Sequence, residues 1–169
     1  MTETYISYPS PLGELTVAGD GKYITRVVFP GIRRGSSLPR QNSPLLQEAC
    51  RQLDEYFAGR RFVFDLPLRA AGTPFQMRVW KALEKVPYGK TCSYGQLAAW
   101  AGNPRAARAV GGAVHVNPIA ILIPCHRVIG ADGTLTGYGG GLWRKEFLLQ
   151  LEKSFLPRIK NPAEGPGSV

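Results

Sequence analysis

The sequence has few of the side chains that bind metals or form disulfides. It contains two histidines and three cysteines, which are Cys50, Cys92 and Cys125. Three cysteines cannot all pair with one another, and none has the CxxC spacing that is typical of zinc sites. The sequence therefore predicts no disulfide framework, no metal site and a reducing compartment.

The sequence also lacks a long hydrophobic run. No apolar stretch approaches the roughly 20 residues that a membrane-spanning helix needs. The first ten residues, MTETYISYPS, have neither the basic start nor the apolar segment of a secretory signal. We therefore expect a cytoplasmic protein that does not bind a membrane, with enough hydrophobic residues (44%) to form a core.

Acidic residues are scarce in the second half of the chain. The net charge is +9, and residues 73–169 hold twelve Lys and Arg against five Asp and Glu, whereas residues 1–72 hold nine against seven. A basic half favours a polyanionic partner such as nucleic acid, because neutralised phosphates release condensed counterions. A solvated basic surface has the same composition, so charge alone leaves both interpretations open.

Residues 1–72 have the pattern of a small sheet with one helix. Apolar residues recur at helical spacing from Leu45 to Phe57, and Gly59 follows as a stop signal. Turn residues separate four expected strands, at residues 4–8, 15–18, 24–29 and 62–66. No residue of this half has an evident chemical role, so we interpret it as a scaffold.

Residues 73–153 are mainly helical. Thr73 and Ser93 are candidate N-caps of two helices, and Asn103 is the candidate cap of a third helix that begins at Pro104. The second and third helices, joined by a turn with Gly102, match a helix-turn-helix. A closing helix is expected from Trp143 to Leu151. The remaining residues, 154–169, hold three prolines and two glycines and are predicted to be disordered.

The third helix of this half is unusually smooth. Its small residues leave Arg108 as the one long side chain. A helix with ordinary side chains is about 10–12 Å wide, and the DNA minor groove is about 6 Å wide. A helix of Ala and Gly can approach such a groove closely, and a single long side chain can enter the base stack. Tight helix–helix packing is the alternative, although two consecutive glycines weaken a helix by about 1 kcal/mol each relative to Ala.

Cys125 differs from the other cysteines because His126 follows it directly. A buried cysteine is usually an inert apolar residue, which is our interpretation of Cys50 and Cys92. A thiolate is a nucleophile, and an imidazole can remove the thiol proton directly or through one water. A carboxylate can then hold the imidazole in the required tautomer. Adjacency in sequence does not establish contact between the two side chains.

These motifs resemble a known family. Residues 73–152 resemble the catalytic domain of the methylated-DNA–protein-cysteine methyltransferases, and Ser10–Gly13 adds a weaker resemblance in the first half. The motifs that match in order and spacing are Ser93-Tyr94, GNPRAARAVGG (102–112), Asn117-Pro118, IPCHRV (123–128) and GYGGG (137–141).

The resemblance implies both a fold and an activity. The implied fold is α+β, with a ribonuclease H-like first domain (1–72) and a winged-helix-like second domain (73–153) that contains the helix-turn-helix. The implied activity is direct repair of double-stranded DNA: an alkyl group moves from O6 of guanine, and also from O4 of thymine, to a cysteine of the protein. The implied protein is a monomer that needs no cofactor and acts once per molecule.

The resemblance also implies the roles of the reacting residues. Cys125 would accept the alkyl group, His126 would deprotonate it through a water, and Glu152 would orient His126. Asn117 would occupy the turn between the DNA-reading helix and a strand that carries the cysteine. Tyr94 would crowd the phosphate that rotates as the base flips and would donate a proton to the departing purine.

Further residues would contact the DNA. Arg108 would replace the flipped guanine in the base stack. Positions of DNA contact would include Gln76, Gly95, Asn103, Ala107, Gly112 and Ala131. The walls of the guanine pocket would be formed by Val114, Pro118, Tyr138 and Gly139.

Two other functions use part of the same pattern. A non-catalytic protein that binds alkylated bases would share the fold but replace the cysteine, which this chain keeps at position 125. A cysteine hydrolase would need a histidine from a separate part of the chain and an oxyanion hole, and the sequence supports neither beyond Cys125-His126.

Overall fold

The computed structural model describes residues 2–32 and 37–156. Contacts divide the chain into two compact units. The first contains the residues up to Ala71 together with Pro118–Ala120, and the second contains Gly72–Asn117 together with the residues from Ile121 onward. The sequence did not indicate the return of residues 118–120 to the first unit. The domain limits 1–72 and 73–153 stay a prediction.

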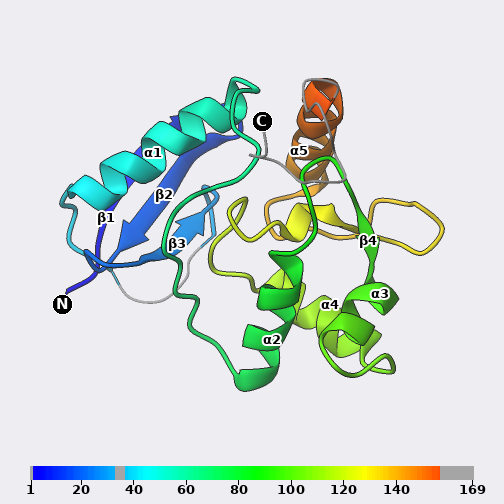
Figure 1. Cartoon of the computed structure of the whole chain (residues 1–169). Helices are drawn as coiled ribbons and strands as arrows, with labels where there is room; N and C mark the ends of the chain where they lie inside the picture. The colour runs from blue at the N-terminus through cyan, green and yellow to red at the C-terminus, as the bar shows by residue number, and fades with distance from the viewer. Residues whose placement is uncertain (1, 33–36, 157–169) are drawn as a thin grey trace. The chain divides into compact units, whose positions relative to one another are not determined.

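A three-stranded antiparallel sheet forms the first unit (Figure 1). Its strands are β1 (Thr4–Ser10), β2 (Gly13–Gly19) and β3 (Ile24–Val28), in that order across the sheet. The tight connection between β1 and β2 depends on Gly13, whose φ of 103° is in the left-handed region that favours glycine.

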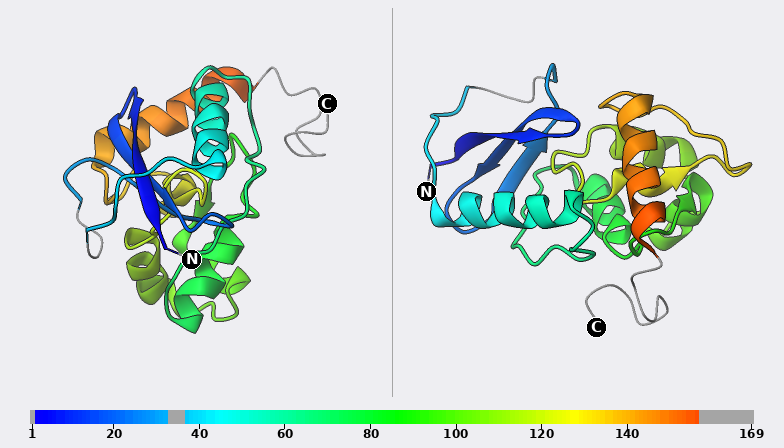
Figure 2. Two further views of the ribbon diagram at one scale, coloured as in Figure 1. Left: turned by 90° about the vertical axis from the view of Figure 1, so that its left-hand side faces the viewer. Right: turned by 90° about the horizontal axis from the view of Figure 1, so that it is seen from above.

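Helix α1 (Pro44–Phe57) covers one face of this sheet, as both views in Figure 2 show. The side chain of Ser43 caps the helix by accepting a hydrogen bond from the Leu46 amide. The expected apolar stripe is buried, with Ala49 and Leu53 fully covered. The first unit therefore has the sheet-and-helix arrangement that the sequence predicted.

The strand predicted at residues 62–66 does not form. The backbone of Asp65 instead pairs with the side chain of Gln52, whose Nε2 donates to the Asp65 carbonyl at 3.0 Å and whose Oε1 accepts from the Asp65 amide at 2.8 Å. Leu68 then makes one isolated parallel bridge to Ile24. A buried glutamine of α1 thus supplies hydrogen bonds that a neighbouring strand would have supplied.

Residues Pro118–Ala120 join the sheet beside β3. The Val27 amide donates to the Pro118 carbonyl and the Ala120 amide donates to the Val27 carbonyl, each at 3.0 Å. Ile119 lies between them and is fully buried. This short segment therefore anchors the chain shortly before it reaches Cys125.

The second unit begins with a helical cluster of α2 (Pro74–Leu83), α3 (Tyr94–Trp100) and α4 (Ala107–His115) (Figure 1). Thr73 and Ser93 cap α2 and α3 as predicted, each within a reciprocal capping box. The indole Nε1 of Trp80 on α2 donates to the Ala113 carbonyl on α4 at 2.9 Å. The α3–α4 pair is the predicted helix-turn-helix.

The predicted cap of α4 is wrong. The helix begins at Ala107, and its N-cap residue, Ala106, makes no side-chain capping bond. Asn103 forms a turn instead, because its Oδ1 accepts a hydrogen bond from the Arg105 amide two residues later. Such a local bond competes with helical capping for asparagine side chains.

The rest of the second unit surrounds Cys125. A 3₁₀ helix, η1 (Cys125–Arg127), is followed by β5 (Val128–Ile129), which pairs in parallel with β4 (Cys92–Ser93). The expected strand that carries the cysteine is therefore absent, since Cys125 opens η1. None of the helices in residues 2–32 and 37–156 has the length and apolar character needed to cross a membrane.

Helix α5 (Leu142–Phe155) closes the described part of the chain. It begins close to Trp143, as predicted, and continues to Phe155. Ser154 and Phe155, the first residues of the predicted disordered tail, are therefore helical. Residues 157–169 of that tail lie outside the described residues.

Replacing Gln52 tests the connection that takes the place of the predicted strand. Gln52→Ala removes both hydrogen bonds to Asp65, so we expect the free energy of unfolding to fall by about 1–2 kcal/mol. Urea denaturation followed by circular dichroism measures the change. Gln47→Ala, at an exposed position of the same helix, should change it by less than about 0.5 kcal/mol. Equal effects of the two substitutions would contradict the assigned role.

Candidate active site

The thiol of Cys125 is almost fully buried, with the residue 5% exposed. Its Sγ lies 3.7 Å from the hydroxyl of Tyr138. Asn117, also buried, donates from Nδ2 to the Ile123 carbonyl at 2.9 Å, which fixes the turn before the cysteine. Ile121 in this turn has a φ of 72°, a rare conformation for a β-branched residue. Strain of this kind tends to gather at functional sites.

His126 is held from the side by a buried carboxylate. Its Nε2 lies 2.7 Å from Oε2 of Glu152, and the two residues are 0% and 1% exposed. Glu152 comes from α5, which brings it next to η1. The sequence-based expectation that Glu152 contacts His126 therefore agrees with the geometry.

Two further residues donate hydrogen bonds to Glu152. Arg127 donates from Nε to Oε1 at 2.9 Å and from Nη2 to Oε2 at 3.0 Å, and the Gly89 amide donates to Oε1 at 3.1 Å. Arg127 also donates from Nη1 to the Val86 carbonyl at 2.6 Å. Arg127 had no role predicted from the sequence, although it directly follows the Cys125-His126 pair.

These contacts set the charges in the site. Burial raises the pKa of Glu152, but its contacts with His126 and Arg127 lower that pKa by more, so the carboxylate is ionised. Burial lowers the pKa of His126 despite the opposing effect of Glu152, so the imidazole is neutral. A neutral imidazole that donates Nε2–H to Glu152 carries its lone pair on Nδ1. This Nδ1 is buried and has no hydrogen-bond partner among the described residues.

The thiol of Cys125 needs a base to ionise. Burial raises its pKa, while hydrogen bonds from Asn117 and Tyr138 and the charge of Lys145 lower it by less. The resting cysteine is therefore a thiol. Burial also raises the pKa of Cys50 and of Cys92, each to about 11. Neither has a histidine beside it in the sequence, and their interpretation as inert residues stays a prediction.

Lys145 is a charged residue of the site that was not predicted from the sequence. It is 0% exposed, its Nζ donates to the Thr136 carbonyl at 3.4 Å, and it lies 6.0 Å from the ring centroid of Tyr138. Burial lowers its pKa, and a negative charge on Cys125, once the thiolate has formed, raises it. Lys145 lies one helical turn from Leu148 and two turns from Glu152, on the buried face of α5. This spacing was the signal in the sequence that could have indicated a buried position for Lys145.

The residues predicted to contact DNA are mostly on the surface of the second unit. Arg108 and Gly112 are exposed on α4. A Cβ atom added to Gly112 would meet no described atom within 4 Å, so tight helix packing does not explain this glycine. The residues that α4 buries are Val110, Ala113 and Val114.

The remaining predicted contacts differ in exposure. Gly95, Asn103, Ala131 and Gly139 are exposed, whereas Ala107 is partly covered. The side chain of Gln76 completes the capping box of α2 by accepting from the Thr73 amide. Val114 is buried, and Pro118 belongs to the first unit. The roles of these residues toward DNA stay predictions.

Tyr94 connects the helix-turn-helix to the loop before α5. It is the first residue of α3, and its hydroxyl lies 2.6 Å from Oγ1 of Thr136. Thr136 is two residues before Tyr138, the partner of Cys125. Tyr94 was predicted from the sequence as a site residue, but its contact with Thr136 was not.

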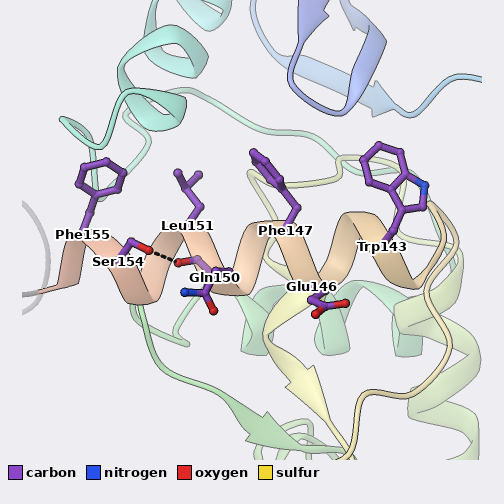
Figure 3. Close-up of a pocket in the computed structure, with 7 residues that line it drawn as sticks. All are labelled: Trp143, Glu146, Phe147, Gln150, Leu151, Ser154 and Phe155. Carbon is purple, nitrogen blue, oxygen red and sulfur yellow. Dashed lines mark hydrogen bonds between the residues drawn. The ribbon is translucent and has the colours of Figure 1, made fainter.

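A separate hollow lies on another face of α5 (Figure 3). Aromatic and aliphatic side chains one turn apart point into it, and its lining consists of Trp143, Glu146, Phe147, Gln150, Leu151, Ser154 and Phe155. None of these residues is a predicted site residue. Within the described part of the chain, no group of three or more His, Cys, Asp or Glu side chains is arranged to hold a metal ion.

Comparisons with known proteins match nearly the whole described chain. The family model for the 6-O-methylguanine DNA methyltransferase DNA-binding domain matches residues 74–154, and the model for the ribonuclease-like domain of the same proteins matches residues 4–70. A methylated-DNA–protein-cysteine methyltransferase of Methanosarcina acetivorans is 49% identical over 153 residues, which is 89% of this chain and 98% of the relative. One of Haemophilus influenzae is 46% identical over 165 residues, which is 95% of this chain and 90% of the relative.

A solved structure is similar over the same length. The crystal structure of Mycobacterium tuberculosis OGT in complex with DNA is 50% identical in sequence, with a TM-score of 0.86. The match covers 90% of this chain and 94% of that one.

Replacing Arg127 tests how strongly the site depends on the buried ion pair. Arg127→Met leaves Glu152 ionised without its main cationic partner, so the free energy of unfolding should fall by about 3–5 kcal/mol. Arg51→Met removes two ion pairs of α1, with Glu48 and Glu55, in which the arginine side chain is 54% exposed, and it should cost less than about 1 kcal/mol. Chemical denaturation of both variants gives the comparison.

The loss of unfolding free energy in Arg127→Met should depend on pH. The pKa of Glu152 is lower in the folded protein than its ordinary value of 4.5, so its ionised form stabilises the fold above that pH, and this stabilisation is lost as the pH falls. The difference in the free energy of unfolding between Arg127→Met and the parent protein should therefore become smaller below pH 4.5. A difference that stays constant in acid would show that Arg127 does not act through Glu152.

Proposed function

The chain belongs to the 6-O-methylguanine DNA methyltransferase family, and from that membership we propose how its own residues carry out the reaction. It repairs DNA by transferring an alkyl group to a cysteine of the protein. We assign the acceptor to Cys125, because this cysteine alone adjoins a histidine that a buried carboxylate orients. Cys50 and Cys92 have no such neighbour in the sequence.

His126 is the base for Cys125 in this proposal. With Nε2–H directed at Glu152, Nδ1 carries the lone pair that can accept the thiol proton. A buried Nδ1 without a described partner is the kind of atom that an ordered water satisfies, and one water can carry the proton between the two side chains. The ionised Glu152 then stabilises the imidazolium that forms.

Two groups stabilise the thiolate after the proton has left. The hydroxyl of Tyr138 donates to Sγ, since it already lies 3.7 Å away. The buried ammonium of Lys145 adds a favourable charge. In a water-poor site these contributions are larger than they would be at the protein surface.

We propose that helix α4 enters the minor groove of the DNA. Its exposed surface presents Arg108 beside Gly112, which suits the narrow minor groove. The O6 atom of guanine faces the major groove, so the base must leave the duplex to reach a protein bound on the other side. Flipping costs a few kcal/mol for unstacking and unpairing, and Arg108 offsets part of that cost by filling the vacated place.

The transfer is a displacement at the alkyl carbon. The sulfur–carbon bond forms, the carbon–O6 bond breaks, and the electron pair passes to the purine, which receives a proton from the hydroxyl of Tyr94. No cofactor is needed, because the damaged base brings the alkyl group. The product is a thioether that water does not cleave, so each molecule acts once. The same steps apply to O4 of alkylated thymine.

The remaining assignments complete the proposal. Asn117 holds the turn that presents Cys125. The flipped base contacts Val114, Pro118, Tyr138 and Gly139, while the DNA backbone contacts Gln76, Gly95, Asn103, Ala107, Gly112 and Ala131. We place the protein in the cytoplasm as a monomer, because free cysteines suit a reducing compartment and one chain holds all of these residues.

The chemistry predicts one methyl group per protein molecule. Incubation with an oligonucleotide duplex that carries O6-methylguanine should add about 14 Da to the Cys125 peptide, because one thiolate attacks once. Intact-mass and peptide mass spectrometry measure the product. Cys125→Ser should abolish the transfer, whereas Cys50→Ser and Cys92→Ser should leave it unchanged. Label on another cysteine, or turnover beyond one equivalent, would refute the assignment.

The role of Arg108 predicts a dependence on base pairing. Arg108→Ala should slow methyl transfer from duplex DNA by about tenfold or more, because a group that stabilises the flipped state contributes more than 1.4 kcal/mol. The reduction in the methyl-transfer rate should be smaller when the lesion is opposite a poorly pairing base. Transfer from a free O6-alkylguanine base should be unaffected, since it requires no flipping.

Arg105 provides the matched control, because it is an exposed arginine just before α4. Arg105→Ala should weaken binding to every duplex by a similar factor and show no dependence on pairing, as expected for a phosphate contact. Single-turnover rates with matched and mismatched duplexes separate the two effects. An Arg108 variant that behaves like the Arg105 variant would rule out the flipping role.

A further inference from the structure

The phenol of Tyr94 is held at three points in the structure. Its backbone is fixed at the start of α3 by the Ser93–Gln96 capping box. Its ring lies against Gly111 of α4, since a Cβ atom added there would be 3.8 Å from Cδ1 and Cε1 of the ring. Its hydroxyl is 2.6 Å from Oγ1 of Thr136. The first two contacts fix the ring, so the third decides where the hydroxyl hydrogen points.

Thr136 is connected to the reacting sulfur on its other side. Its carbonyl accepts from Nζ of the buried Lys145 at 3.4 Å, and the hydroxyl of Tyr138, two residues later, contacts Sγ of Cys125 at 3.7 Å. The side chain of Thr136 is partly buried. This one residue therefore links Tyr94, on the helix-turn-helix, to the loop that carries a partner of Cys125.

We propose that Thr136 is a positioning residue for Tyr94: its hydroxyl donates a hydrogen bond to the phenol oxygen, which leaves the phenol hydrogen directed at the departing guanine. This inference rests on the proposed function of Tyr94 as the proton donor. A threonine hydroxyl can donate or accept and reaches either state by rotation. A phenol that must donate to the purine has only its oxygen lone pairs left for Thr136, so Thr136 is then the donor.

The arrangement favours proton transfer for a physical reason. As the carbon–O6 bond breaks, the phenol hydrogen moves toward the purine and negative charge develops on the phenol oxygen. A hydrogen bond donated to that oxygen becomes charge-assisted, and such bonds are about twice as strong as neutral ones. Hydrogen bonds in a chain also polarise one another, which makes the phenol a better donor. Thr136 therefore acts on the transition state more than on the bound substrate.

The test compares three substitutions in the loop of the full-length protein. Thr136→Val has nearly the same shape but no hydroxyl, and it should slow single-turnover methyl transfer from duplex DNA by about tenfold. Thr136→Ser keeps the hydroxyl and should stay within about twofold of the parent rate. Thr134→Val is the matched control, because the hydroxyl of Thr134 donates to Asp132 instead of Tyr94, and its rate should be that of the parent.

A double-mutant cycle shows whether Thr136 acts through Tyr94. Tyr94→Phe removes the phenol hydroxyl, so adding Thr136→Val to it should cause no further loss of rate. The reaction of Cys125 with iodoacetamide, which needs no proton donor, should be the same in Thr136→Val and the parent. Multiplied losses in the double variant, a parental rate in Thr136→Val, or slowed iodoacetamide reaction would each overturn the inference.

The same experiment separates this inference from the function on which it rests. If the parent protein methylates Cys125 and Thr136→Val does so at the same rate, the role of Thr136 fails while the proposed function stands. If the parent protein transfers no methyl group, the proposed function fails first, and the inference fails with it.

Discussion

The carboxylate of Glu152 is the group on which the active site depends. An ionised carboxylate that is 1% exposed would cost several kcal/mol of lost hydration if it lacked partners. Its oxygens instead accept hydrogen bonds from His126, from two nitrogens of Arg127 and from the Gly89 amide. These donors come from η1 and from the loop after α2, so the need to satisfy one charge brings α5, η1 and that loop together. The tautomer of His126, and so the position of its imidazole lone pair on Nδ1, follows from the same need.

Much of the fold could be predicted because it depends on local chemistry. The helix starts at Thr73 and Ser93 were correct, since each cap needs only a hydroxyl and a glutamine three residues later. The helix start at Asn103 was wrong because the side chain bonds to a nearer amide. The strand at residues 62–66 was wrong because Gln52, in another element, satisfies the backbone there. Both of these errors occur where a polar side chain could form its hydrogen bonds with either of two partners.

The active site likewise contains residues that could be predicted from the sequence and residues that could not. The family resemblance indicated Cys125, His126 and Glu152, and the structure brings the last two within 2.7 Å. Lys145 and Thr136 were missed for a different reason. Charged and hydroxyl side chains are usually solvated, so neither residue type signals a buried role by itself. Their partners lie in other elements or in a loop without a repeating pattern, and only the folded chain brings them together.

The covered, protonated state of Cys125 also affects how long an undamaged molecule remains usable. Peroxides and disulfides in a cell react with exposed thiolates, and their rates follow thiolate content and access. A sulfur that is 5% exposed, with a pKa raised by burial, is a poor target for both. Burial and protonation therefore protect the Cys125 thiol from the oxidants and electrophiles that consume exposed thiolates.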